Sequence, residues 1–325
     1  MGMQDFAAEF QTPEHYIIDI TYKIWEEQGV GRIRDWYATD CPVRSPSGVS
    51  DTSEEVVKQT LSSQHTFPHR DLLAEDVIIG DKPSGFYSSH RVRGIGRHLG
   101  DGSYGPATQR PVTTLAIADC LCRENRVVEE WVLGDQATML LQLGLDPVAY
   151  GHALGRENPA AYTVGNEAMR QRWADPHGLT IVGEATIATR VLDTYAAIWQ
   201  DKNLHGIPEH YDRAVRFEGP GGQVCYGRTR MSNALTAMLA AVPDGRFEPH
   251  HLIVRQQADR AVRVALRWSF CGTHTGHGRY GVPSGVPVAL LAISHLELRD
   301  GKVTQEWLVA DDTAIYAQIA AQQLG

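Results

Sequence analysis

The chain has 325 residues, of which 42% are hydrophobic and 21% charged, and its formal net charge is −9. This length predicts two domains or one large one, and the hydrophobic content excludes general disorder. The acidic balance and the lack of a Lys/Arg run exclude nucleic acid as an expected partner, and no apolar run approaches the roughly 20 residues of a membrane helix.

The N-terminal segment and the cysteines predict where the protein resides. The opening MGMQDFAAEF has neither a basic region nor an apolar stretch of signal-peptide length. The five cysteines are odd in number and include no CxxC pair, so reduced thiols are expected. We therefore expect a cytoplasmic protein with no membrane partner.

The first predicted elements are helices. Thr12-Pro13 begins the first helix, because proline is favoured in a first turn, and isoleucines then recur at helical spacing until Gly29 ends it. A short helix over 32–37 follows, and a third over about 53–64 begins with a capping box. The second half of the chain predicts matching helices near 185–200, 206–212 and 228–241.

Strands follow the helices in each half. The second half predicts strands over 261–270, 286–298 and 302–309, with a hairpin turn at Arg299-Asp-Gly301. Glu124-Asn125 takes the place of that turn in the first half. Helices followed by antiparallel strands predict an α+β fold.

The chain repeats itself. Residues 89–144 align without a gap on 265–320, with 18 identities in 56 positions, and His98 meets His274. We predict a first domain over 1–145, a connector over 146–183 and a second domain over 184–325. The connector predicts a short helix from Asn158-Pro159 through about Trp173.

The second copy carries motifs of a known family. GTHTG at 272–276, GVPSG at 281–285 and DGK at 300–302, followed by Glu306-Trp307, resemble the SnoaL-like polyketide cyclase family of the nuclear-transport-factor-2-like superfamily. The first copy matches less well, since GRHLG at 96–100 replaces GTHTG. The chain thus resembles a tandem SnoaL-like protein, with the first copy more divergent.

This resemblance implies both a fold and a type of chemistry. It implies two tandem cone-shaped curved antiparallel sheets, each packed with about three N-terminal helices. Enzymes of the superfamily use a dry pocket with one or two acid–base side chains and no cofactor. We therefore expect a cofactor-independent general acid–base enzyme for a small, partly apolar carbonyl compound, of the aldol cyclase, isomerase, dehydratase or hydrolase type.

The resemblance places a catalytic Asp on the strand before DGK, where the copies read Ala118-Asp119 and Ser294-His295. A shift of one residue moves a side chain to the other face of a sheet, so two alignments stay open. If Asp119 and His295 face the pocket, each can serve as a base. If Ala118 and Ser294 face it, neither copy keeps the family's carboxylate.

Histidines supply further candidates. His98 and His274 either hold a substrate oxyanion or brace their glycine-rich loops. His250-His251, aligned with Arg70-Asp71, supply either a second acid–base group or a polar turn. The candidate catalytic residues are His295, His274, Asp119, His98, Asp71 and His251.

Aromatic and basic side chains supply candidate ligand contacts. Core packing is the alternative for the aromatic residues, and a plain ion pair is the alternative for the arginine. The candidate substrate-binding residues are Trp268, Tyr280, Trp307 and Arg91. No metal site is predicted, because His274 and His277 do not form a helical HExxH motif and have no acidic neighbour.

Duplication also implies an architecture. The sheet-to-sheet dimer of this fold can form within one chain as an intramolecular pseudo-dimer, and a homodimer of the whole chain stays open. The second copy, closer to the family pattern, is the expected catalytic one. The alternatives are a non-catalytic small-molecule-binding protein and a purely structural pseudo-dimer.

Overall fold

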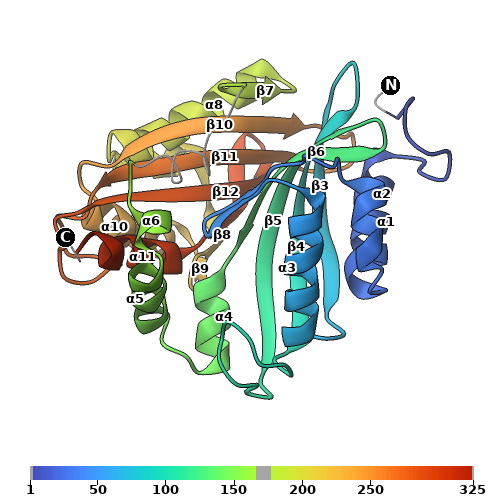
Figure 1. Cartoon of the computed structure of the whole chain (residues 1–325). Helices are drawn as coiled ribbons and strands as arrows, with labels where there is room; N and C mark the ends of the chain where they lie inside the picture. Colours follow the sequence, from blue (N-terminus) through green and yellow to red (C-terminus); the bar gives the residue numbers. More distant parts are fainter. Residues whose placement is uncertain (1–2, 166–176, 324–325) are drawn as a thin grey trace. The chain divides into compact units, whose positions relative to one another are not determined.

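The computed structural model describes residues 3–165 and 177–323. The chain forms two compact units, Met1–Leu145 and Asp146–Gly325, and each contains its own sheet and helices (Figure 1). Among the described residues, no helix is both long and apolar enough to cross a bilayer.

The N-terminal unit has three α-helices before its strand β3 and a curved sheet of order β2-β1-β6-β5-β4-β3. Strands β3 to β6 are antiparallel, whereas β1 runs parallel to β6. Its elements are α1 (Pro13–Thr21), η1 (Tyr22–Glu26), η2 (Val30–Arg32), α2 (Ile33–Trp36), β1 (Val43–Ser45), β2 (Gly48–Ser50), α3 (Ser53–Thr66), β3 (Asp71–Asp81), β4 (Phe86–Arg97), β5 (Pro111–Arg123), β6 (Arg126–Gly134) and α4 (Gln136–Leu143).

The C-terminal unit repeats this plan in a sheet of order β7-β10-β11-β12-β13-β8-β9. Here β7 is parallel to β10, and β8 is parallel to β13. Its elements are α5 (Pro147–Glu157), α6 (Pro159–Tyr162), β7 (Thr180–Val182), α8 (Ala185–Tyr195), η3 (Ala196–Gln200), η4 (Leu204–Gly206), α9 (Ile207–His210), β8 (Tyr211–Gly219), β9 (Gln223–Tyr226), α10 (Arg228–Ala241), β10 (Arg246–Arg255), β11 (Val262–Thr273), β12 (Pro287–Arg299), β13 (Lys302–Ala310) and α11 (Asp312–Gln322).

Local sequence explains the helix starts. The Thr12 hydroxyl accepts a hydrogen bond from the His15 amide, and the Thr52 hydroxyl accepts one from the Glu55 amide, so α1 and α3 begin where the sequence predicts. The helices α1 and α8, which correspond in the two copies, each end in a π-helical turn, η1 or η3. These turns set the direction in which the chain leaves the helix.

Three features differ from the sequence analysis. The sheets are mixed rather than antiparallel, because the strands β1, β7 and β8 add parallel pairs at or near the sheet edges. Helices α4, α5 and α11 were not predicted. Asn158 caps α6, but that helix ends at Tyr162, and the part of the predicted connector helix over 166–173 lies outside the described residues.

The strand registers correct one alignment between the copies. On β4, Arg91 pairs with Asp76, and on β11 the equivalent Arg267 pairs with His251. The strands β3 and β10 each carry a bulge one residue before these positions, so the bulge does not change the count between the copies. His251 is therefore the counterpart of Asp76, and Asp71 that of Arg246, since each pair has equivalent partners on the next strand.

Candidate functional site

The N-terminal unit encloses a cavity of about 350 Å³ between its sheet and the helices α1 and α3. Alternate residues of β4 and β5 face it, as the two-residue period of a strand requires. The cavity is lined by Ile17, Ile20, Thr21, Trp25, Tyr37, Val43, Val56, Gln59, Thr60, Ser63, Arg70, Leu72, His90, Val92, Gly94, Thr114, Ala116, Ala118, Cys120, Val127, Glu130 and Val132.

Glu130 is the carboxyl group of this cavity. It is 7% exposed, and the Tyr37 hydroxyl donates a 2.9 Å hydrogen bond to its Oε2 atom. Burial raises the pKa of Glu130 to about 7, although hydrogen bonds from Tyr37 and Cys120 act to lower it. A carboxyl of this kind both accepts and returns a proton near neutral pH.

His90 lines the same cavity from β4. Burial, reinforced by the charge of Arg91, lowers the pKa of His90 to about 4, so its ring is neutral at pH 7. Its Nε2 atom is buried and has no hydrogen-bond partner. A neutral imidazole in such a place can hydrogen-bond to a bound oxygen atom.

The sheet keeps these two groups apart. His90 is paired with Ala118 on β5, and Glu130 with Cys120 two residues further along the same strand. One strand therefore separates them, a backbone spacing of about 10 Å. The small Ala118 side chain lies on the wall between them, which leaves room for a ligand.

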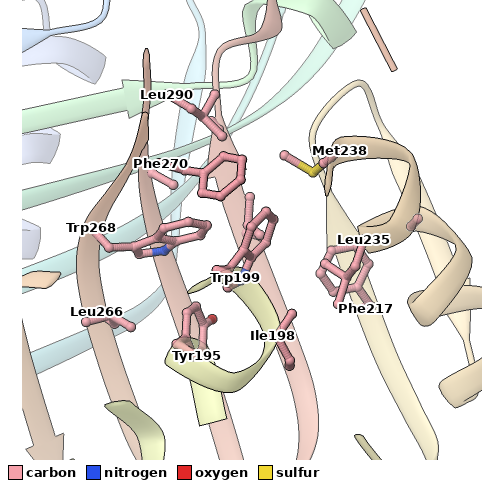
Figure 2. Close-up of a cluster of buried hydrophobic side chains, with 14 of the residues drawn as sticks. Tyr195, Ile198, Trp199, Phe217, Leu235, Met238, Leu266, Trp268, Phe270 and Leu290 are labelled. Atoms are coloured by element: carbon pink, nitrogen blue, oxygen red, sulfur yellow. The ribbon is translucent and has the colours of Figure 1, made fainter. Parts of the chain in front are cut away.

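In the C-terminal unit large side chains fill the equivalent space. Trp268, Phe270 and Leu290 stand where the N-terminal unit has Val92, Gly94 and Thr114, and each is at most 4% exposed. Figure 2 shows Trp268 packed among Trp199, Tyr195 and Phe270. The ring centroids of Trp199 and Trp268 are 4.7 Å apart.

The filled unit retains a buried carboxyl, Glu306. Tyr195 donates to its Oε1 atom at 2.6 Å and Tyr211 to its Oε2 atom at 2.9 Å, so both oxygens are engaged. Burial raises the pKa of Glu306 to about 7 as well. Thr21 takes the place of Tyr195 in the N-terminal unit, since Thr21 ends α1 and Tyr195 ends the corresponding helix α8.

Strand alternation places Asp119 and His295 away from the inner faces. Ala118 and Cys120 line the cavity, so Asp119 points to the opposite face of β5. On β12 the inward residue is Ser294, whose hydroxyl accepts a 3.1 Å hydrogen bond from Trp268 Nε1. His295 is buried on the other face, opposite Trp307.

His98 and His274 lie inside their own loops. Both are fully buried, and their Nδ1 atoms lie 3.1 Å from Thr108 Oγ1 and 3.0 Å from Ser284 Oγ. Neither is among the residues that line the N-terminal cavity. This geometry favours the interpretation that they brace the loops.

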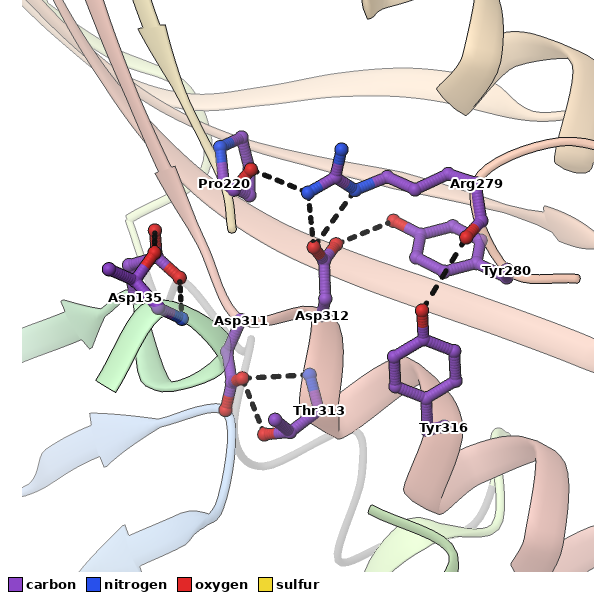
Figure 3. Close-up of polar contacts among 9 residues, drawn as sticks. Asp135, Pro220, Arg279, Tyr280, Asp311, Asp312, Thr313 and Tyr316 are labelled. Carbon is purple, nitrogen blue, oxygen red and sulfur yellow. Dashed lines mark hydrogen bonds and ion pairs between the residues drawn. The ribbon is translucent and has the colours of Figure 1, made fainter. Parts of the chain in front are cut away.

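Tyr280 belongs to a polar network that ties its loop to α11 (Figure 3). Its hydroxyl lies 3.2 Å from Asp312 Oδ1, and Arg279 donates to Asp312 Oδ2 and to the carbonyl oxygen of Pro220. Burial opposes the charge of Arg279, but Asp312 outweighs it and raises the pKa of the guanidinium. The network is structural.

The remaining predicted site residues also lie outside the cavity. Asp71 is exposed at the start of β3, and His251 is buried beside its strand partner Arg267. Arg91 forms an ion pair with Glu75 at 3.1 Å. Trp268 fills the C-terminal interior, and Trp307 pairs with His295 on the opposite sheet face.

The positions that face the cavity differ systematically between the two copies, and this difference is a sequence signal for the site. Comparison of the two copies at inward positions shows small or polar residues in the first and large apolar ones in the second. The exchanged pairs are Thr21/Tyr195, Val43/Phe217, Val92/Trp268, Gly94/Phe270 and Thr114/Leu290. Glu130, which has the same residue type as its counterpart Glu306, lines the cavity among these exchanged positions.

No metal site accompanies the cavity in what the structure describes. Across residues 3–165 and 177–323, no group of three or more His, Cys, Asp or Glu side chains is arranged to hold an ion. The polar groups available to a ligand are therefore Glu130, Tyr37, His90 and Arg70, together with the hydroxyls and amide of α3.

Comparison with known proteins identifies the C-terminal unit. Residues 189–319 match the SnoaL-like polyketide cyclase family. The chain therefore contains a SnoaL-like domain, which is the family that its GTHTG and DGK motifs indicate. No curated protein matches the chain.

Solved structures of similar sequence each match somewhat under half of the chain. IdmH of Streptomyces antibioticus, a proposed polyketide cyclase, is 22% identical, with a TM-score of 0.36, over 42% of this chain and 100% of its own. AclR of Streptomyces galilaeus, a proposed hydroxylase, is 25% identical, with a TM-score of 0.36, over 42% and 82%. A proposed SnoaL-like polyketide cyclase of Jannaschia sp. CCS1 is 19% identical, with a TM-score of 0.37, over 46% and 96%.

Proposed function

We propose that the N-terminal unit is the working copy, a cofactor-independent acid–base site for a small, partly apolar carbonyl compound. The observation that carries this proposal is Glu130, a buried carboxyl with a pKa of about 7 on the wall of a cavity of about 350 Å³. The C-terminal unit serves as a filled, non-catalytic copy.

In this proposal each polar group has one role. The Glu130 carboxylate removes a proton from the carbon beside the carbonyl and later returns it, and the Tyr37 hydrogen bond fixes the carboxylate in place. His90, neutral and on the other side of the cavity, donates a hydrogen bond to the enolate oxygen. Enolisation of this kind underlies aldol cyclisation, isomerisation and dehydration alike.

The lining of the cavity suits a substrate that is apolar over most of its surface. Isoleucine, valine and leucine side chains from α1, α3 and the sheet make up much of the lining. Because these walls exclude water, an ionic or hydrogen-bonding interaction inside the cavity is stronger than it would be in solution. A planar or cyclic ketone matches such walls better than a strongly hydrated metabolite does.

The test uses a ketone that reports enolisation directly. We expect the protein to accelerate exchange of the α-hydrogens of 2-tetralone with D₂O, followed by NMR, with a rate that rises with pH through about 7. Glu130→Gln should slow the exchange about 100-fold or more. Glu306→Gln is the matched control, because Glu306 is the equivalent glutamate in the filled C-terminal unit. This variant should exchange the α-hydrogens at the wild-type rate.

A non-catalytic binding protein is the second candidate. The observation that favours it is the inner face of β5, which presents Thr114, Ala116, Ala118 and Cys120 and no carboxylate. Binding of 2-tetralone to the wild-type protein without any accelerated exchange would establish this alternative. Exchange that survives in Glu130→Gln would remove Glu130 from the mechanism.

A further inference from the structure

A second cavity of about 340 Å³ adjoins the first in the N-terminal unit. The two share six lining residues, so they meet along a common boundary: Gln59, Ser63, Arg70, Leu72, Gly94 and Thr114. Arg70 is the one charged side chain in that shared set. A ligand that extends from the Glu130 cavity into the second one must pass the Arg70 side chain.

The guanidinium of Arg70 has no counter-charge within the described part of the chain. It donates one hydrogen bond, from Nη1 to Ser63 Oγ at 2.9 Å, and its Nε atom is buried with no partner. Burial lowers the pKa of Arg70. Because a buried charge is costly unless it is paired, a guanidinium left in this state is suited to receive an anion.

The C-terminal unit has exchanged this charge for apolar packing. The helices α3 and α10 each have 14 residues, so their ends match, and Ser63 and Arg70 correspond to Met238 and Gly245. A Cβ atom on Gly245 would collide with the Phe270 ring, whereas the N-terminal unit has Gly94 in place of Phe270. The guanidinium therefore occupies a space that the filled copy gives to an aromatic ring.

The helix beside Arg70 has changed in the same direction. On α3, Gln59, Ser62, Ser63 and Thr66 line the second cavity. Their counterparts on α10 are Ala234, Ala237, Met238 and Ala241. The second cavity therefore has a polar side on α3, opposite apolar side chains such as Ile95, Val112 and Met139, whereas the first is more largely apolar. A ligand that fills both can place a polar group beside α3 and Arg70.

We propose that Arg70 binds a carboxylate at the polar end of the ligand, so that the N-terminal unit takes an apolar carbonyl compound that also carries an acidic group. This inference rests on the proposed function in one respect, namely that the ligand's body occupies the Glu130 cavity. The carboxylate lies between Arg70 Nε and the hydroxyls of α3, and it orients the ligand along the two cavities.

Two isosteric probes test the charge. We expect the wild-type protein to bind 2-naphthoate at least tenfold more tightly than the neutral 2-naphthamide, measured by titration calorimetry at constant pH and ionic strength. Arg70→Met keeps an unbranched, flexible stem and removes the guanidinium charge, so it should abolish this preference and leave 2-naphthamide affinity within about twofold. A charge-assisted hydrogen bond accounts for an effect of this size.

Arg97→Met is the matched control, because Arg97 is exposed and lines neither cavity. Its affinity for both probes should equal that of the wild-type protein. Two results would overturn the carboxylate site: equal wild-type affinity for the two probes, or equal weakening of both by Arg70→Met. Neither result would bear on the 2-tetralone exchange. If the exchange is absent but 2-naphthoate is preferred, the acid–base function fails and the Arg70 site stands.

Discussion

Two buried glutamates differ in what their neighbours allow. Glu130 has one tyrosine partner and lies on a cavity wall, whereas Glu306 has two tyrosine partners and lies in a filled interior. The same residue type at equivalent positions can thus be available to a ligand in one unit and sealed in the other. The difference depends on Thr21 standing where the other copy has Tyr195.

Glu306 predicts a pH dependence of stability. Its folded-state pKa is raised from 4.5 to about 7, so the folded protein binds more protons than the unfolded chain between these values. Glu306 should therefore contribute a fall of up to about 3 kcal/mol in the unfolding free energy as pH rises from 4.5 to 7, beside a similar contribution from Glu130. Denaturant unfolding of the wild-type protein and Glu306→Gln at several pH values measures this, and the variant should show a smaller fall.

The exposed Glu209 provides the control for that experiment. Glu209→Gln should follow the wild-type curve throughout the range. If Glu306→Gln showed the full wild-type pH dependence, the buried carboxyl would not be the group that titrates.

At single positions the sequence could define the candidates but not their orientation. The strand over 111–123 was foreseeable in part, yet whether Ala118 or Asp119 faced inward depended on a register of one residue. The registers of β4, β5 and β6 settle that question, because they fix all the inward positions together. The pKa of Glu130 was equally hidden, since it depends on burial by residues far apart in the chain.

At the scale of elements, the loop from 272 to 286 is held by a helix that follows it in the chain. Arg279 and Asp312 join this loop to the start of α11, and Tyr280 adds a third contact (Figure 3). The Asp312 side chain is 5% exposed, so its partner would be left with an unpaired, largely buried charge if the carboxylate were removed.

This contact predicts a stability effect. Asp312→Ala should lower the unfolding free energy by about 3 kcal/mol, because Arg279 loses its counter-charge in a buried setting. Chemical denaturation measures the loss. Asp259→Ala, at an exposed position, should change stability by less than about 0.5 kcal/mol. A loss no larger than that of Asp259→Ala would show that the pair contributes little.

Elements with a strong local signal were predictable. A capping box and helical spacing defined α1 and α3, and Arg-Asp-Gly defined the β12–β13 hairpin. Helix α11 was not predicted, because it is apolar on nearly every side and has no single periodic stripe. The strands β1 and β8 were not predicted, because their parallel partners are distant in sequence.

At the scale of the whole molecule, duplication preserved the frame of each unit while the interiors diverged. The family match covers the C-terminal unit, yet the cavity lies in the N-terminal one. The shared motifs are concentrated in loops and turns, which define the frame. Sequence similarity therefore indicated the fold of this chain and pointed to the copy with the filled interior.

Reciprocal substitutions test this division between the units. Val92→Trp introduces the residue that the C-terminal unit carries at the same place, so it should fill the cavity and abolish 2-tetralone exchange while the protein stays folded, at a cost of about 1–3 kcal/mol. Trp268→Val should cost more, about 3–5 kcal/mol, because it empties a packed interior, and it should leave exchange unchanged. NMR exchange and denaturant unfolding measure the two effects.

The opposite pattern would reverse the assignment of the units. Exchange that is lost in Trp268→Val but retained in Val92→Trp would place the chemistry in the C-terminal unit. A folded Val92→Trp protein with normal exchange would show that the cavity is not used.

The clash at Gly245 limits what a single substitution can do to the filled interior of the C-terminal unit. A side chain at position 245 meets the Phe270 ring, so Gly245→Arg requires Phe270 to move or to be replaced as well. Because the two positions depend on one another, one mutation alone does not recreate in this unit the arrangement that Arg70 has in the other.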